Sequence, residues 1–517
     1  MNVLDFERGQ ATTAKGSMSR RFFLEGGMCF AAATAFPASR KEPNLRVGIL
    51  SDVHVDSERP AANLERALRH FDRIKVDAVL IAGDLVINGR RWEFERMVSV
   101  WRKVFPNDRR SDGVKVEKLF VTGNHDVDGW CYGQVKTLEE AKECAFYFHR
   151  QEWWREFFGE DYRPVSVKEV KGYKFVLRHW LSICGTEGKR GLKIVDGFED
   201  DPDVTGDFLA AQDLRGSKPF FYVQHEPPRD TVNATWLTRG IRWGGDGDVH
   251  AAAATKMLAD YPNVIALCGH SHFSLTDEMS IWQGAFTAVN CSCLCGYVFT
   301  PPGRENGWNC DDFNRTPPFE MERLDIFAVN QGMVMDVYDD RIVFERREFR
   351  NGHKLGPDWI VPLGVGAPKP YAFESRMREA TAPSFPEDAT ATVSEVFGYG
   401  RDAGGRERAK EGHAQVRVAF PPARSRNGVS SRGWDYAVRC ELLAGDIVRT
   451  LVERCVFSPN SMMSEEDDNQ PVVCAFARSE LPERLAARQK VRFVITPRTC
   501  WGKEGRPISV EWTPKGK

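Results

Sequence analysis

The feature that most limits how this chain can fold is a series of short apolar runs, each of which stops at polar residues. Between the runs, apolar side chains recur at helical spacing, as at Leu64, Leu68 and Phe71 after the helix-capping candidate Asn63. Strands that alternate with amphipathic helices are typical of layered α/β domains. The predicted strands of this part are Leu45–Leu50, Ala78–Ala82, Lys118–Thr122, Phe220–Val223 and Val264–Leu267.

Further along, the sequence predicts a strand over residues 285–289 and a hairpin over residues 333–349 that turns at Asp339-Asp340. We expect an aromatic-rich insertion at about 130–215, where most rings serve packing. The predicted organisation is an export signal at residues 1–40, a main domain at 41–361, a linker or covering loop at 362–387 and a small β-sandwich-like domain at 388–517.

Residues 1–40 differ from the rest of the chain. Ser19-Arg20-Arg21-Phe22-Phe23-Leu24 precedes an uncharged, moderately apolar run from Gly26 to Ala38, and this pattern resembles a twin-arginine export signal. The run is too short for a membrane span, and the alternative is a buried N-terminal helix. We therefore expect export to a periplasmic or extracellular location.

The net charge and the cysteines further limit which functions are possible. The formal net charge is -2 and the sequence pI is near 6.6, so the basic balance of a nucleic-acid binder is missing. Among the 13 cysteines, Cys291, Cys293 and Cys295 alternate in a predicted strand and would share one face. That spacing suits either a metal or small buried side chains, and we favour burial because no second cysteine pair lies nearby.

Polar blocks follow the predicted strands in a fixed order. In an open α/β sheet, loops at the carboxyl ends of strands converge on one crevice, so these blocks are expected to meet there. Their side chains offer imidazole nitrogens, carboxylate oxygens and one amide oxygen, which suits Mn, Fe or Zn better than calcium. The blocks are Asp52-x-His54, Gly83-Asp84, Gly123-Asn124-His125-Asp126, His225 and Gly269-His270-Ser271-His272.

This ordered set resembles the calcineurin-like metallophosphoesterase family over roughly residues 45–350. The resemblance implies a layered β-sandwich flanked by helices and two transition-metal ions that hydrolyse a phosphate ester through a bridging hydroxide. It implies Asp84 as the ligand shared by both ions. The ligands of one ion would be Asp52, His54 and His272, and those of the other Asn124, His225 and His270.

Two further roles follow from the same resemblance. His125 would contact the phosphoryl group or protonate the leaving oxygen, and Asp126 would orient its imidazole. His225 is identified by its order in the chain and its place after a predicted strand, so His179 and His250 are its alternatives.

The sequence also bears on two alternative functions and on the type of ester. A purple acid phosphatase would carry a tyrosine ligand soon after Asp84, where this chain has Leu85-Val86-Ile87. A non-catalytic binding protein on the same fold would be expected to lack some ligands, whereas every position is filled here. The metal-site blocks contain no Arg or Lys, which favours a phosphodiester over a dianionic monoester. The alternative is that Arg229, Arg239 or Arg242 in the loop after His225 folds over the site and supplies this charge.

Overall fold

The computed structural model describes residues 42–128, 137–180, 203–233, 235, 249–295, 329–398, 413–424, 433–445, 447–458, 461–464, 466–477, 481 and 489–513. Contacts divide the chain into the units Met1–Glu42 and Pro43–Lys517. The elements below all belong to the second unit, and the expected export signal lies outside the described residues. Among the described helices, none combines the length and the apolar character of a membrane span.

The first sheet of the main domain has six strands in the order β12-β11-β10-β1-β2-β3. β1, β2 and β3 are parallel, whereas β10 runs antiparallel to β1 and forms the expected hairpin with β11. The strands are β1 (Leu45–Leu50), β2 (Ala78–Ala82), β3 (Glu117–Val121), β10 (Gln331–Val337), β11 (Arg341–Glu348) and β12 (Trp359–Pro362).

The second sheet also has six strands, in the order β4-β5-β6-β7-β9-β8. Its four central strands β5, β6, β7 and β9 are parallel, so their carboxyl ends open at one edge. The strands are β4 (Val165–Val170), β5 (Tyr173–Arg178), β6 (Phe220–Val223), β7 (Val264–Cys268), β8 (Ile281–Gln283) and β9 (Thr287–Asn290).

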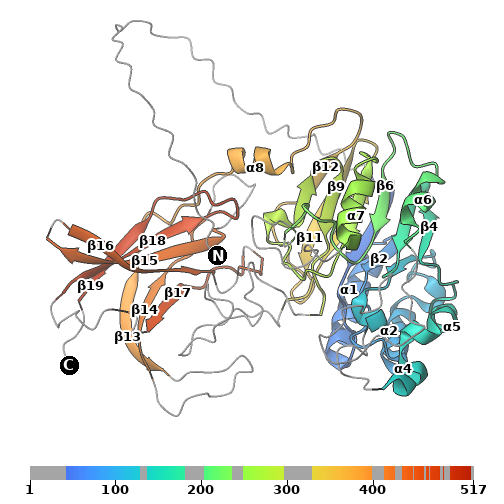
Figure 1. The fold of residues 1–517 in the computed structure, drawn as a ribbon, viewed down its shortest axis with the longest axis horizontal. Coiled ribbons are helices and arrows are strands. Elements are labelled where there is room, and N and C mark those ends of the chain that lie inside the picture. Colours follow the sequence, from blue (N-terminus) through green and yellow to red (C-terminus); the bar gives the residue numbers. More distant parts are fainter. Residues whose placement is uncertain are drawn as a thin grey trace, which may run out of the picture. The chain divides into compact units, whose positions relative to one another are not determined.

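The two sheets pack face to face, because one buried apolar cluster draws on both. Ile49 and Leu80 of the first sheet join Phe221 and Leu267 of the second in this cluster. Helices cover the outer faces: α1, α2 and α5 pack on the first sheet, and α6 and α7 on the second (Figure 1). The helices are α1 (Glu58–Arg73), α2 (Arg91–Val104), α3 (Asn124–Asp128), α4 (Leu138–Cys144), α5 (Phe146–Phe158), α6 (Thr205–Ala210) and α7 (Val249–Leu258).

The C-terminal part is rich in strands, coloured orange to red in Figure 1. It contains a sheet in the order β13-β14-β17 and a second in the order β16-β15-β18-β19, which share one apolar core. The strands are β13 (Thr392–Gly398), β14 (His413–Phe420), β15 (Asp435–Ala444), β16 (Ile447–Val456), β17 (Val472–Ala477), β18 (Val491–Arg498) and β19 (Ile508–Trp512). The predicted fold class, a helix-flanked β-sandwich with C-terminal β-rich sheets, is confirmed.

Two segments that the sequence suggested were an insertion and a linker contribute to the core structure. Within the expected insertion, β4 and β5 join the second sheet, and Trp154 and Phe158 of α5 pack in the core under the first sheet. The expected linker contains α8 (Phe373–Glu379), whose buried Arg376 ion-pairs with Glu278. Arg346 also pairs with Glu278, so two buried arginines share one carboxylate.

Candidate metal centre

The loops that leave the parallel strands hold each other in place through backbone hydrogen bonds. Asp52 follows β1 and donates its N–H to the Gly83 carbonyl at 3.1 Å, and His54 donates to the Asp84 carbonyl at 3.0 Å. Gly269 after β7 donates to the His225 carbonyl after β6 at 2.9 Å. The polar side chains are therefore positioned by paired backbone segments.

The backbone of these loops is also unusual. Left-handed conformations are uncommon in residues other than glycine, and they cluster at functional sites. Among the described residues, eleven non-glycine positions have positive φ, and five of them are predicted metal ligands. These five are Asp52 (48°), His54 (49°), Asp84 (51°), His270 (65°) and His272 (51°).

One group of side chains gathers around Asp52. Its carboxylate oxygen Oδ1 lies 2.9 Å from His272 Nε2, and His272 Nε2 lies 3.2 Å from His54 Nε2. One ligand atom from each of Asp52, His54, Asp84 and His272 lies within 4.8 Å of the others. Two acids and two imidazoles thus face a common point.

A second group lies on the other side of Asp84. His225 Nε2 is 3.1 Å from Asp84 Oδ2 and 3.2 Å from His270 Nδ1. His225 Nδ1 lies 2.7 Å from the Ala82 carbonyl and donates to it, which makes Nε2 the ring nitrogen that faces the group. Because Asp84 Oδ2 is also 3.5 Å from His54 Nε2, this carboxylate belongs to both groups.

The loop after β3 approaches Asp84 from the side. Asn124 begins α3 and is 5% exposed, and the next residue, His125, donates its backbone N–H to Asp84 Oδ1 at 2.9 Å. His125 Nδ1 lies 2.9 Å from the Ile87 carbonyl, so this carbonyl orients the imidazole, where the sequence suggested Asp126. The carboxylate of Asp126 accepts backbone N–H groups instead: those of Leu85, Val86 and Gly123, at 3.1, 2.9 and 2.8 Å.

Glycine is required beside two of these side chains. A Cβ at Gly123 would overlap the Asp84 carboxylate, and a Cβ at Gly269 would overlap Ser51 Oγ and the Asp52 carboxylate. The carboxylates therefore reach their positions only because the neighbouring backbone carries no side chain.

His225 joins the cluster, whereas His179, one of its alternatives from the sequence, does not. His179 follows β5, but its Nδ1 accepts the Thr122 N–H at 3.0 Å and its ring packs 4.7 Å from Trp154 and 4.5 Å from Tyr162. His250 lies in α7, and its side chain is outside the described residues.

Part of the chain matches a known protein family. Residues 45–274 match the family model of the calcineurin-like phosphoesterases. These residues form a calcineurin-like phosphoesterase domain. No curated protein sequence matches the chain.

Solved structures resemble the fold at low identity. A dimetal phosphatase from Danio rerio is 15% identical with a TM-score of 0.36, covering 62% of this chain and 100% of that one. A purple acid phosphatase from yellow lupin (Lupinus luteus) is 13% identical with a TM-score of 0.37, covering 62% and 55%. GAP50, the anchor in the inner membrane complex of Plasmodium, is 12% identical with a TM-score of 0.34, covering 62% and 89%. All three TM-scores lie below 0.5, so the assignment of the phosphoesterase domain rests on the family model.

The residues of the phosphoesterase domain fit the metal ions that its family implies. Asp52 and Asp84 are at most 1% exposed, and within the described residues their ion pairs are all with histidines. Buried carboxylates need nearby positive charge, and this mixture of oxygen and nitrogen donors suits transition metals.

Burial and the buried carboxylates shift three pKa values within the domain. Burial lowers the pKa of His225, but the carboxylates of Asp84 and Asp52 outweigh it and raise this pKa to about 9. Burial lowers the pKa of His54 to about 4. Burial and the Asp84 carboxylate raise the pKa of Asp126 to about 8, against the three N–H donors that lower it.

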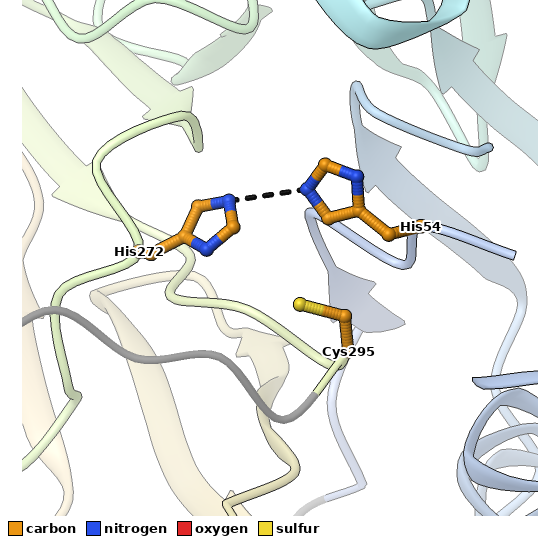
Figure 2. Close-up of side chains that lie close together, drawn as sticks. All are labelled: His54, His272 and Cys295. Atoms are coloured by element: carbon orange, nitrogen blue, oxygen red, sulfur yellow. Dashed lines mark hydrogen bonds between the residues drawn. The ribbon is translucent and has the colours of Figure 1, made fainter. Parts of the chain in front are cut away.

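Sequence reasoning missed two neighbours of the centre. The rings of His225 and His270 lie 5.9 and 5.7 Å from Trp180, whose buried Nε1 donates no hydrogen bond within the described residues. Ligand atoms of His54, His272 and Cys295 lie within 4.8 Å of one another (Figure 2). The alternating cysteines were a signal for the second neighbour, whereas nothing in the sequence around Trp180 marked it.

Proposed function

We propose that the protein is a dinuclear metal-dependent hydrolase of phosphate esters. The observation that carries this proposal is that two buried carboxylates and four imidazoles from the ends of β1, β2, β6 and β7 form two adjoining groups that share Asp84. This donor set is larger than one transition-metal ion uses, and Asp84 lies within reach of both halves.

The ligand assignment divides the centre into two halves. We assign one metal ion to Asp52, His54 and His272, a second to Asn124, His225 and His270, and Asp84 to both. When bound, the two ions would supply Lewis acidity towards the phosphate and lower the pKa of a water molecule. The Ala82 carbonyl holds His225 in the tautomer that such ligation requires.

His125 is the proposed proton donor to the leaving oxygen. Its Nδ1 lies 2.9 Å from the Ile87 carbonyl, which orients the imidazole, and its ring lies 4.6 Å from that of His54. A group with this position can deliver a proton without being a metal ligand. Asp126 would act indirectly, by fixing the loops that carry Asp84 and His125.

For the ester type we favour a phosphodiester. The ion-pair partners of the two buried carboxylates are histidines, and the neighbouring Trp180 Nε1–H is a neutral donor. Neither supplies the permanent positive charge of an arginine or a lysine. A monoanionic diester needs less positive charge than a dianionic monoester. The test compares kcat/KM for a phosphomonoester and a phosphodiester that carry the same activated leaving group. A value at least tenfold higher for the monoester would overturn this preference.

The proposed function is tested by metal analysis and turnover on the same variants. Wild type should bind two ions per chain, and Asp84→Ala should lose more metal than a variant in a ligand of only one ion, such as His270→Ala. His125→Ala should keep its metal and lose about 10²- to 10⁴-fold in turnover.

Three results would contradict the proposal. One ion or none in a folded wild type would exclude a dinuclear centre, and metal loss in His125→Ala would make His125 a ligand. Full metal loading without hydrolysis of any mono- or diester would favour the alternative, a non-catalytic metal-binding protein on this fold.

We also propose export through the twin-arginine pattern, whose residues lie outside the described part of the chain. Replacing Arg20 and Arg21 with lysine should retain the protein in the cytoplasm, as fractionation would reveal. Unchanged export would refute this reading.

A further inference from the structure

A sixth strand end opens beside the metal centre. β9 is the parallel neighbour of β7, with Leu267 opposite Val289 and Cys268 opposite Asn290. The loop after β9 therefore leaves the sheet at the same edge as His270 and His272. Cys295 lies five residues after the end of β9, in this loop.

Hydrogen bonds fix this loop against the ligand loop of β1. Leu294 donates its N–H to the Ser51 carbonyl and Cys295 donates to the Asp52 carbonyl, both at 3.1 Å. The loop itself is shaped by Ser292, which has φ of 59° and donates its N–H to the Asn290 side chain at 2.8 Å. Cys295 is thus attached through its backbone to a predicted ligand, Asp52.

The side chain of Cys295 turns towards two further predicted ligands. Figure 2 shows its thiol directed at the gap between the imidazoles of His54 and His272. One nitrogen of each ring and the Cys295 sulfur lie within 4.8 Å of one another. The two Nε2 atoms are 3.2 Å apart and can share at most one proton, so a cation that accepts both lone pairs relieves this contact.

The neighbouring cysteines are placed differently. Cys291 is fully buried in the core between the sheets, and Cys293 is fully buried in an apolar cluster with Val329 and Phe457. Cys295 is only partly buried, which is where a residue at the rim of a site belongs. Cys295 also packs against the cluster of Cys293, but of these three cysteines it alone is grouped with histidine nitrogens.

We propose that the Cys295 thiolate is a direct ligand of the metal ion held by Asp52, His54 and His272. The inference rests on the proposed dinuclear centre and adds a soft donor to one half of it. Binding exchanges the S–H bond for a sulfur–metal bond, and the proton leaves to water. Thiolate ligands favour zinc, whereas manganese favours oxygen donors, so this half of the centre selects zinc over manganese.

The first test is spectroscopic and uses the full chain loaded with cobalt(II) in place of zinc. A sulfur-to-cobalt charge-transfer band should appear in the near ultraviolet in wild type, and it should be absent in Cys295→Ser and Cys295→Ala. Cys144→Ser is the matched control, because Cys144 is another partly buried thiol, located in α4, and donates to the Glu140 carbonyl. It should keep the band at full intensity.

Metal affinity gives a second readout. Cys295→Ser should weaken zinc binding roughly 10- to 100-fold, since even residues that only support a ligand cost that much. Manganese affinity should change by less than about threefold, so the ratio of zinc affinity to manganese affinity should fall. An equal loss for both metals would point to a damaged fold and would overturn the assignment.

X-ray absorption of zinc-loaded wild type keeps the proposal testable if the variants do not fold. A zinc–sulfur distance of about 2.3 Å should accompany nitrogen and oxygen ligands at about 2.0 to 2.2 Å. Zinc bound without sulfur, or a cobalt band that survives in Cys295→Ser, refutes the thiolate ligand but leaves the dinuclear hydrolase intact. Failure to bind either metal would refute both.

Discussion

His179 offers a test of how the structure divides the histidines between ligation and packing. It is 3% exposed, its Nδ1 accepts the Thr122 N–H, and its ring packs against Trp154 and Tyr162. Burial, with a smaller effect of Lys168, lowers its pKa from 6.5 to about 3. The imidazole is therefore held neutral in the folded protein.

The sign of the effect on stability follows from proton binding. Below pH 6.5 the unfolded chain takes up a proton at this histidine, and the folded protein does not until the pH approaches about 3. The free energy of unfolding therefore falls with falling pH, by about 1.4 kcal/mol per unit. Between pH 6.5 and pH 5 this amounts to about 2 kcal/mol from this one side chain.

The perturbation is His179→Gln, which keeps an acceptor but cannot titrate. Urea unfolding at pH 7.5 and pH 5.0, followed by tryptophan fluorescence, gives the loss of stability on acidification. This loss should be about 2 kcal/mol smaller in His179→Gln than in wild type. Both proteins are stripped of metal for this comparison, so that the ligand histidines contribute equally and cancel.

Two results would refute the reasoning. An identical pH dependence in His179→Gln and wild type would mean that the folded protein can protonate His179. Loss of metal from His179→Gln after reconstitution, comparable to that from His225→Gln, would mean that His179 is a ligand.

Two further changes test the supporting structure. Gly123→Ala removes no ligand, but its Cβ would displace the Asp84 carboxylate. Zinc affinity measured by calorimetry should therefore fall at least about tenfold. Gly206→Ala is the control, because a Cβ there meets nothing within 4 Å, and it should leave the zinc affinity unchanged. Glu278→Gln leaves two buried arginines without their counter-charge and should lower the free energy of urea unfolding by about 3 to 5 kcal/mol. Glu374→Gln is the control at an exposed position and should change this free energy by less than about 0.5 kcal/mol. Equal metal affinity in Gly123→Ala and wild type, or equal stability of the two glutamine variants, would contradict these predictions.

Local patterns in the sequence were sufficient to predict the fully buried parallel strands. β1, β2, β6 and β7 coincide with their predicted apolar runs to within one residue, because a strand that is buried on both faces is mostly apolar. β4 is an edge strand in which only the end residues Val165 and Val170 are buried, and no continuous apolar run reveals it. Aromatic residues around it therefore suggested an insertion.

The sequence by itself determined the kind of chemistry at the strand ends. Asp52, His54, Asp84, His270 and His272 follow strands directly, and their side chains come together because parallel strands open at a common edge. Only residue type and order along the chain were needed for this prediction.

The tertiary structure decided which of several similar residues reach the centre. His179 and His225 each follow a parallel strand, yet only His225 faces Asp84, whereas the Thr122 N–H and an aromatic cluster hold His179 away. Cys295 reaches the centre because its backbone pairs with Asp52, which lies more than two hundred residues earlier. Contacts of this range depend on how the two sheets pack, and no local pattern encodes them.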